Sequence, residues 1–228
     1  MVDVYIPILL AVIISITHYF SNKLKIRKTL HNHRIFSFSA GVSITYILLE
    51  LFPTFTEKAI GTSKLLYVSV LGGFIIHHII EKEIYQHNKR HELIRMLGFE
   101  EKLFSFIYHI IIGYVLVSFA KVNITQAILF SIPMLSYTFL SNLPATPHAV
   151  KIKAIFLSSA TTLGTIIALL IWKYVPGWVE TALIGLSIGV LLFTVIRHHI
   201  PFGKKGKIGY FTIGFTIYSI LIILSWYV

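Results

Sequence analysis

Eight apolar stretches constrain this chain more than any other feature of its sequence. They lie near 3–20, 35–53, 65–81, 103–120, 125–141, 153–172, 178–197 and 207–227. An α-helix needs about 20 mainly apolar residues to cross a hydrocarbon core of roughly 30 Å. Only 13% of the residues are charged, against about 25% in a typical soluble domain. The sequence therefore predicts an all-α integral membrane protein with eight transmembrane helices, in a single domain over residues 1–228.

Basic residues follow the predicted topology. Sixteen lysines and arginines fall in the odd-numbered connections between helices and four in the even-numbered ones. Lys and Arg concentrate in cytoplasmic loops, so this bias predicts that both termini lie outside. Orientation and anionic lipid explain the net charge of +11, because no groove-reading motif accompanies it. We expect the lipid bilayer as a partner and no nucleic acid.

The ends of the first helix and the residue types indicate the compartment. Asp3 precedes the first apolar stretch and no small-residue cleavage pattern follows it, which predicts a retained helix instead of a signal peptide. The absence of cysteine excludes disulfides and thiolate metal sites. Abundant isoleucine and lysine fit a prokaryote, so we expect a multi-pass protein of the prokaryotic plasma membrane. The longest predicted loop, 82–102, is cytoplasmic.

Residues 103–141 form a central pair of predicted helices. Gly113 lies within the first helix and Pro133 within the second. Broken or bent helices in a membrane often line transport sites, where neighbours or water satisfy the freed backbone groups. The pair therefore predicts a pathway, although it carries no carboxylate at mid-membrane depth.

Helices 2 and 7 share an internal pattern. Residues 39–42 match 187–190 in Ser, Gly and Val, and the glycine of each lies twelve residues before a proline. Glu50 corresponds to His198. The two helices are five apart in order and cross in opposite directions, which is typical of inverted repeats in secondary transporters; a chance match is the alternative. The pattern predicts a 3+2+3 plan, with repeat 1 near 3–81, the central pair at 103–141 and repeat 2 near 153–227.

These features resemble the ZIP family of metal transporters. That family has eight helices, a 3+2+3 inverted repeat, outside termini and a His-bearing loop between helices 3 and 4. Its helices 4 and 5 carry motifs of the form His-Asn-x-Pro-Glu-Gly and His-Glu/Asn-Ile-Pro-His/Glu, and its helix 6 often reads Glu-Pro-Leu-Gly. The resemblance implies a mid-membrane site, whose matched positions here are Tyr108, His109, Ile112, Phe130, Ser131, Met134 and Thr161, with Glu50 and His198 near further polar positions.

Almost all of the family's ligands are replaced. The matched positions offer a phenol, an imidazole, two hydroxyls and a thioether, with no formal negative charge unless Tyr108 ionises. Divalent cations need charged oxygen or imidazole ligands to repay their desolvation, so we expect no conventional zinc site. His109 is a candidate metal ligand or proton carrier, or else a packing residue. Tyr108, Ser131 and Thr161 line a pathway or bond across helices.

Four histidines near the predicted loop form a second candidate site. His87 and His91 share a helical face, and a carboxylate could complete a weak metal site. Histidines that seek the membrane interface are the alternative. The four residues are His77, His78, His87 and His91.

Two functions remain open. The first is a ZIP-like secondary transporter with elevator-type movement, whose ancestral substrate is a divalent metal such as zinc and whose present substrate differs. The second is a non-transporting structural or regulatory membrane protein on the same scaffold. We expect no enzyme and no resident cofactor, because no intramembrane hydrolase motif is present and the spacing of Ser105 and His109 arises easily by chance. Small-residue faces permit a homodimer.

Overall fold

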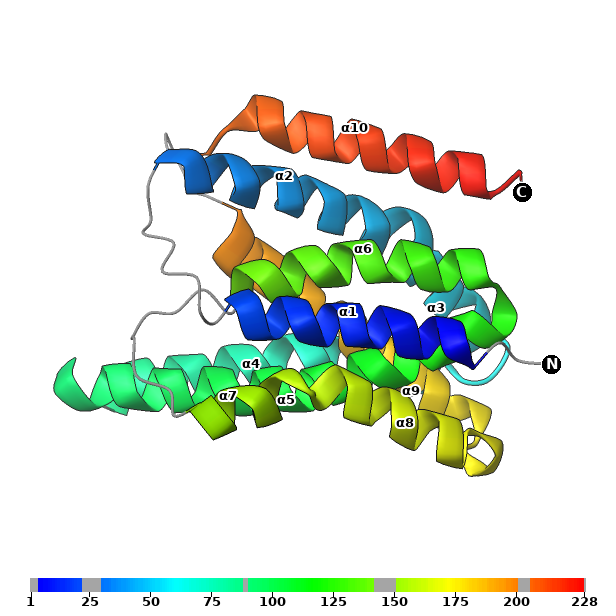
Figure 1. The fold of residues 1–228 in the computed structure, drawn as a ribbon, viewed down its shortest axis with the longest axis horizontal. Coiled ribbons are helices and arrows are strands. Elements are labelled where there is room, and N and C mark those ends of the chain that lie inside the picture. The colour runs from blue at the N-terminus through cyan, green and yellow to red at the C-terminus, as the bar shows by residue number, and fades with distance from the viewer. Residues whose placement is uncertain (1–3, 22–29, 88–89, 142–150, 201–205, 228) are drawn as a thin grey trace.

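The computed structural model describes residues 4–21, 30–87, 90–141, 151–200 and 206–227. The side chains of 30–32, 87, 90–101, 141, 151–154 and 198–199 lie outside that description. The described residues form helices and no strand. Figure 1 shows these helices lying side by side, with both ends of the chain at one end of the bundle. We call this the termini end.

The helices have the following bounds. They are α1 (Tyr5–Ser21), α2 (Leu30–Tyr46), α3 (Phe52–Ile60), α4 (Tyr67–His87), α5 (Arg90–Val122), α6 (Ile124–Ser141), α7 (Lys151–Ser158), α8 (Ala160–Ile171), α9 (Gly177–Thr194) and α10 (Ile208–Ser225). Short π-helical turns at Ile47–Leu51 and Val195–His199 follow α2 and α9, and 3-10 turns cover Lys64–Leu66 and Trp172–Tyr174.

Several of these helices can cross a membrane. Within the described residues, five are long and apolar enough: His33–Ile60, Lys64–Gln86, Lys102–Val122, Gly177–Arg197 and Ile208–Ser225. Three shorter apolar helices cover Tyr5–Ser21, Ile124–Leu140 and Ala160–Tyr174. The fold is therefore all-helical and compatible with a helical membrane protein. The count of eight spans, the 3+2+3 plan and the orientation stay predictions.

The predicted cytoplasmic loop 82–102 differs from the structure. Helix α4 continues to His87 and α5 begins at Arg90, so all of this segment except residues 88–89 is helical, and those two lie outside the described residues. The segment is rich in Glu, Lys, Arg and Leu and contains no proline. These residues favour helix even in water, so charge alone does not indicate a loop.

Proline and glycine do not break the helices where the sequence predicted. Helix 2 was expected to end at Pro53, yet the chain stays helical to Ile60 after a π-helical turn over Ile47–Leu51. Proline has no N–H to donate within the helix and its ring crowds the preceding turn, and the wider turn just before it absorbs this irregularity. Gly113 and Pro133 lie inside the uninterrupted α5 and α6. The central pair is thus not broken.

Pro133 is accommodated by a hydrogen bond from another helix. A proline cannot donate to the carbonyl four residues earlier, which here belongs to Leu129. The hydroxyl of Tyr218 on α10 donates to the Leu129 oxygen. Tyr218 is 1% exposed, so water does not compete for this bond.

Glycine pairs set the closest helix contacts. A Cβ built on Gly41 would lie 2.3 Å from the Phe211 oxygen, and one on Gly189 would lie 2.1 Å from the Val70 oxygen. Helix α2 therefore packs on α10, and α9 packs on α4, with their backbones touching. Gly113 and Gly164 join α5 and α8 in the same way. Small residues at such crossings are typical of helices that associate in membranes.

The first prediction concerns the Leu129 carbonyl. Tyr218→Phe leaves this buried oxygen without its donor, and we expect the free energy of unfolding in mixed micelles to fall by about 1–3 kcal/mol. Pro133→Ala restores an N–H to the helix, so the same tyrosine change in a Pro133→Ala background is expected to cost much less. Equal losses in both backgrounds would show that the bond to Leu129 does not carry the effect.

The second prediction concerns the glycine crossings. Gly41→Ala and Gly189→Ala are expected to destabilise the fold by about 1–3 kcal/mol each, because the added carbon meets backbone that cannot move away. Gly209→Ala is the matched control, since nothing lies within 4 Å of a Cβ there. If Gly209→Ala lowers the free energy of unfolding in micelles as much as the other two changes do, close backbone packing is not the cause.

Candidate functional site

Tyr108 lies where three helices meet. Its hydroxyl donates to the Ser187 oxygen of α9 at 3.2 Å and lies 3.9 Å from the Met134 sulfur of α6. Tyr108 is 3% exposed and Met134 is fully buried. The structure therefore brings together two matched positions from the central pair, and adds a residue of the α9 repeat segment.

Tyr46 also belongs to this group and was missed by the sequence reasoning. Its ring lies 6.0 Å from that of Phe130, and its hydroxyl interacts electrostatically with Tyr108. The Tyr46 hydroxyl is buried without a hydrogen-bond partner in the described part of the chain. A usable signal was present, because Tyr46 shares a helical face with Ser39, Ser43 and Glu50.

Both ring nitrogens of His109 are hydrogen-bonded to groups outside the Tyr108 contacts. Its Nδ1 lies 2.6 Å from the Ser105 carbonyl oxygen, and its Nε2 lies 3.1 Å from the Thr138 Oγ1. A carbonyl oxygen only accepts, so Nδ1 carries the proton and Nε2 accepts from Thr138. Both nitrogens of the neutral ring are engaged, which favours the packing interpretation of His109.

His18 of α1 stacks on His109. The ring centroids are 4.6 Å apart at an interplanar angle of 25°, and both side chains are fully buried. The sequence signal was a histidine within an otherwise apolar first helix. Two stacked imidazoles repel each other if both are charged, so this contact too favours neutral rings.

The remaining central positions fill space or bond locally. Ile112 and Phe130 are fully buried in the main core, and Ile112 stands where the resemblance implies an acidic ligand. The Ser131 hydroxyl donates to the Ile128 oxygen of its own helix, so it does not join the Tyr108 group. Thr161 is fully buried next to Gly113, and its hydroxyl has no partner among the described residues.

Glu50 lies in the first π-helical turn. It is 8% exposed, and its Oε2 accepts from the Trp226 Nε1 at 3.3 Å. Gln126 of α6 also hydrogen-bonds to this carboxylate. π-helical turns occur often at functional sites, and an ionisable group inside a membrane domain marks a functional candidate. Its counterpart His198 lies in the second π-helical turn, with its side chain outside the described residues.

The histidines of the second candidate site do not form a loop cluster. His77 and His78 lie inside α4, which continues beyond them to His87. The His77 ring packs against Phe104 and Phe193, with centroids 5.1 and 4.7 Å away, while His78 is exposed. The side chains of His87 and His91 lie outside the described residues. In the part that the structure describes, no three His, Asp or Glu residues gather as a metal site.

An ionic cluster at the termini end was also missed. The Glu180 Oε1 of α9 lies 2.6 Å from the Lys58 Nζ of α3 and accepts from the Ser118 Oγ of α5 at 2.6 Å. The Lys121 Nζ lies 4.0 Å from the centre of the Trp172 ring and interacts electrostatically with Glu180. These residues fall in separate predicted spans and connections, so only their predicted common side of the membrane could have linked them.

Comparison with protein-family models and with curated proteins finds no match for this chain. The argument about function therefore depends on the geometry described above.

The third prediction tests the role of His109. Thr138→Val removes the donor to Nε2, and we expect the free energy of unfolding to fall by about 1–3 kcal/mol because a buried acceptor is left unpaired. Thr17→Val is the control, since the Thr17 hydroxyl bonds only within an exposed turn of α1. If both changes cost the same in micelle unfolding, the hydrogen bond to His109 is not structural.

Proposed function

We propose that the chain is a secondary membrane transporter with a ZIP-like scaffold. In this proposal eight helices cross the membrane in a 3+2+3 inverted repeat, with both termini outside. The helices α5 and α6 move with α1 and α8 against a scaffold made by α2, α3, α4, α9 and α10. The substrate differs from the family's divalent metal because the charged ligands are lost.

This proposal depends on the matching positions of the glycine contacts in two helix pairs, α2 with α10 and α9 with α4. Gly41 contacts Phe211 and Phe215 of α10, and Gly189 contacts Val70 and Phe74 of α4. The number of residues from Gly41 to Gly189 equals the number from the start of the first π-helical turn to the start of the second. Likewise, the sequence separation between Val70 and Phe211 equals that between Phe74 and Phe215. A chance match of sequence letters does not require such matched contacts, which supports the inverted repeat.

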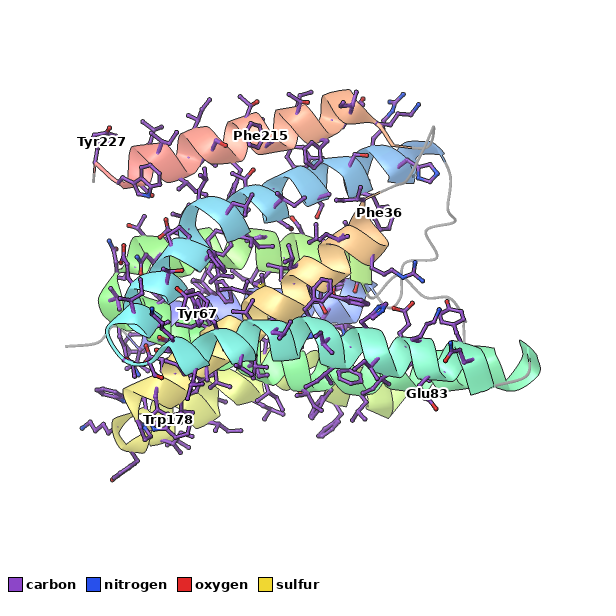
Figure 2. All side chains as sticks on the ribbon, turned by 180° about the vertical axis from the view of Figure 1, so that it is seen from behind. Phe36, Tyr67, Glu83, Trp178, Phe215 and Tyr227 are labelled. Carbon is purple, nitrogen blue, oxygen red and sulfur yellow. The ribbon has the colours of Figure 1, made fainter. Side chains whose placement is uncertain are left out.

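The distribution of aromatic and basic residues supports the orientation. Figure 2 places Tyr67, Trp178 and Tyr227 toward the termini end and Glu83 toward the other. Trp226 adjoins Tyr227, and Trp172 carries Lys121 against its face. Tryptophan and tyrosine favour the membrane interface, and Lys and Arg favour the cytoplasmic side. The end opposite the termini holds Arg197, which pairs with Glu81, and Lys82, which adjoins Glu83.

The ion pairs at the two ends of the bundle connect different parts of the proposed transporter. Glu180 and Lys58 at the termini end also engage Ser118 of α5, so that cluster links the proposed scaffold to the moving bundle. Glu81 and Arg197 lie 3.3 Å apart at the other end, and both belong to the proposed scaffold. This asymmetry supports an arrangement that is closed toward the outside.

The alternative function has its own supporting observation. Ile112 and Phe130 are fully buried in the core, and Phe119 packs against Phe130 with ring centroids 5.3 Å apart. A structural or regulatory membrane protein on this scaffold would have its central helices packed in this way. The two functions differ in whether the central pair moves, because only the transporter requires that movement.

The fourth prediction tests that movement. The chain has no cysteine, so a Ser118→Cys, Glu180→Cys pair can be joined selectively by a short bis-maleimide in proteoliposomes. We expect this link to stop uptake of a panel of divalent ions, protons and small neutral or anionic solutes. A Glu81→Cys, Arg197→Cys pair is the control, because a link within the scaffold should leave uptake unchanged.

Uptake at background for the whole panel in the unlinked protein would exclude the transporter proposal. It would leave the structural or regulatory alternative.

A further inference from the structure

A row of buried polar residues lines one face of α2. Ser39, Ser43 and Tyr46 are 2, 0 and 0% exposed, and Glu50 continues the row in the π-helical turn. They recur at helical spacings of three and four residues and so share one face. Gly41 points the opposite way, into its contact with α10. The polar row therefore faces the interior of the bundle.

The hydroxyls of this row have no hydrogen-bond partner within the described residues. This holds for Ser39, Ser43 and Tyr46, and also for Ser187 across the interface on α9. Nearly all buried polar groups in native proteins are hydrogen-bonded, and an unsatisfied group calls for an explanation. Four such hydroxyls on two repeat-related helices indicate that a bound molecule supplies their partners.

The chemistry of this group limits what that molecule can be. The Tyr108 hydroxyl contacts the Ser187 carbonyl and the Met134 thioether, and Tyr46 interacts electrostatically with Tyr108. The Ser187 hydroxyl is buried on the same residue as that carbonyl. Hydroxyls both donate and accept hydrogen bonds, and the carbonyl and thioether only accept. Among these groups there is no formal charge to offset that of an ion. The nearest carboxylate, Glu50, is already held by Trp226 and Gln126.

On the basis of the proposed transport function, we propose that Tyr46, Tyr108, Met134 and Ser187 form the binding site for a small uncharged solute that both donates and accepts hydrogen bonds. Ser39 and Ser43 extend this site along α2. The site replaces the charge-based recognition of a cation by hydrogen bonding, which matches the loss of every acidic ligand from the central pair.

Flux measurements in proteoliposomes test the proposal. Urea and glycerol serve as uncharged probes, and zinc, sodium and phosphate as charged ones. We expect flux of at least one uncharged probe and none of the charged ones. Tyr46→Phe and Ser187→Ala each remove one hydrogen bond to a neutral ligand, so we expect each to lower the flux about three- to tenfold at low solute concentration.

Stability measurements separate binding from a structural role. Neither hydroxyl has a partner in the described residues, so both variants should unfold at the same temperature as the parent protein, or higher. Tyr174→Phe, at an exposed phenol, and Ser225→Ala, at a hydroxyl bonded within its own helix, are matched controls that should keep full flux.

Each other outcome has a distinct meaning. Flux of a charged probe alone would overturn the uncharged-solute site and leave the transporter proposal standing. Water flux without urea or glycerol flux would also overturn it. Equal flux in Tyr46→Phe, Ser187→Ala and the controls would show that these hydroxyls do not bind the solute. Background flux for every probe would remove the transporter proposal itself.

Discussion

Direct contact between helix backbones is the interaction on which this fold depends. In a bilayer, lipid tails are as apolar as leucine, so burying apolar side chains adds little to helix association. Glycines let the helix backbones approach closely, and dispersion contacts between those backbones then drive the association. Three such crossings join α2 to α10, α4 to α9 and α5 to α8. Two of them, at Gly41 and Gly189, have neighbours at matching positions of α10 and α4.

A membrane interior also demands that every backbone group find a partner inside the protein. The chain meets this demand at its prolines in two different ways. At Pro53 a π-helical turn precedes the proline and the helix continues. At Pro133 the helix stays regular, and the hydroxyl of Tyr218 satisfies the carbonyl of Leu129. The two π-helical turns, Ile47–Leu51 and Val195–His199, lie outside the central pair and contain Glu50 and His198.

The central site around Tyr108 is built from uncharged side chains. Tyr108 and Met134 meet there, while the neighbouring His109 is engaged by Ser105 and Thr138. Adjacent residues on a helix point about 100° apart, so a motif that reads as one unit in sequence is divided between two interfaces. One face holds α5 against α1 and α6 through His109, and the other directs the Tyr108 hydroxyl to Ser187 of α9 and Met134 of α6.

The amino-acid sequence alone determined the helical membrane class, the approximate position of each apolar helix and the matched pattern around Gly41 and Gly189. These properties are local or periodic, and hydrophobic length and residue spacing express them directly. Only the tertiary structure decided that His109 is satisfied, that Tyr46 belongs beside Tyr108 and that Glu180 bridges separate helices. Such relations depend on how helices rotate about their axes and which faces meet, and that choice is made by packing between residues distant in the chain.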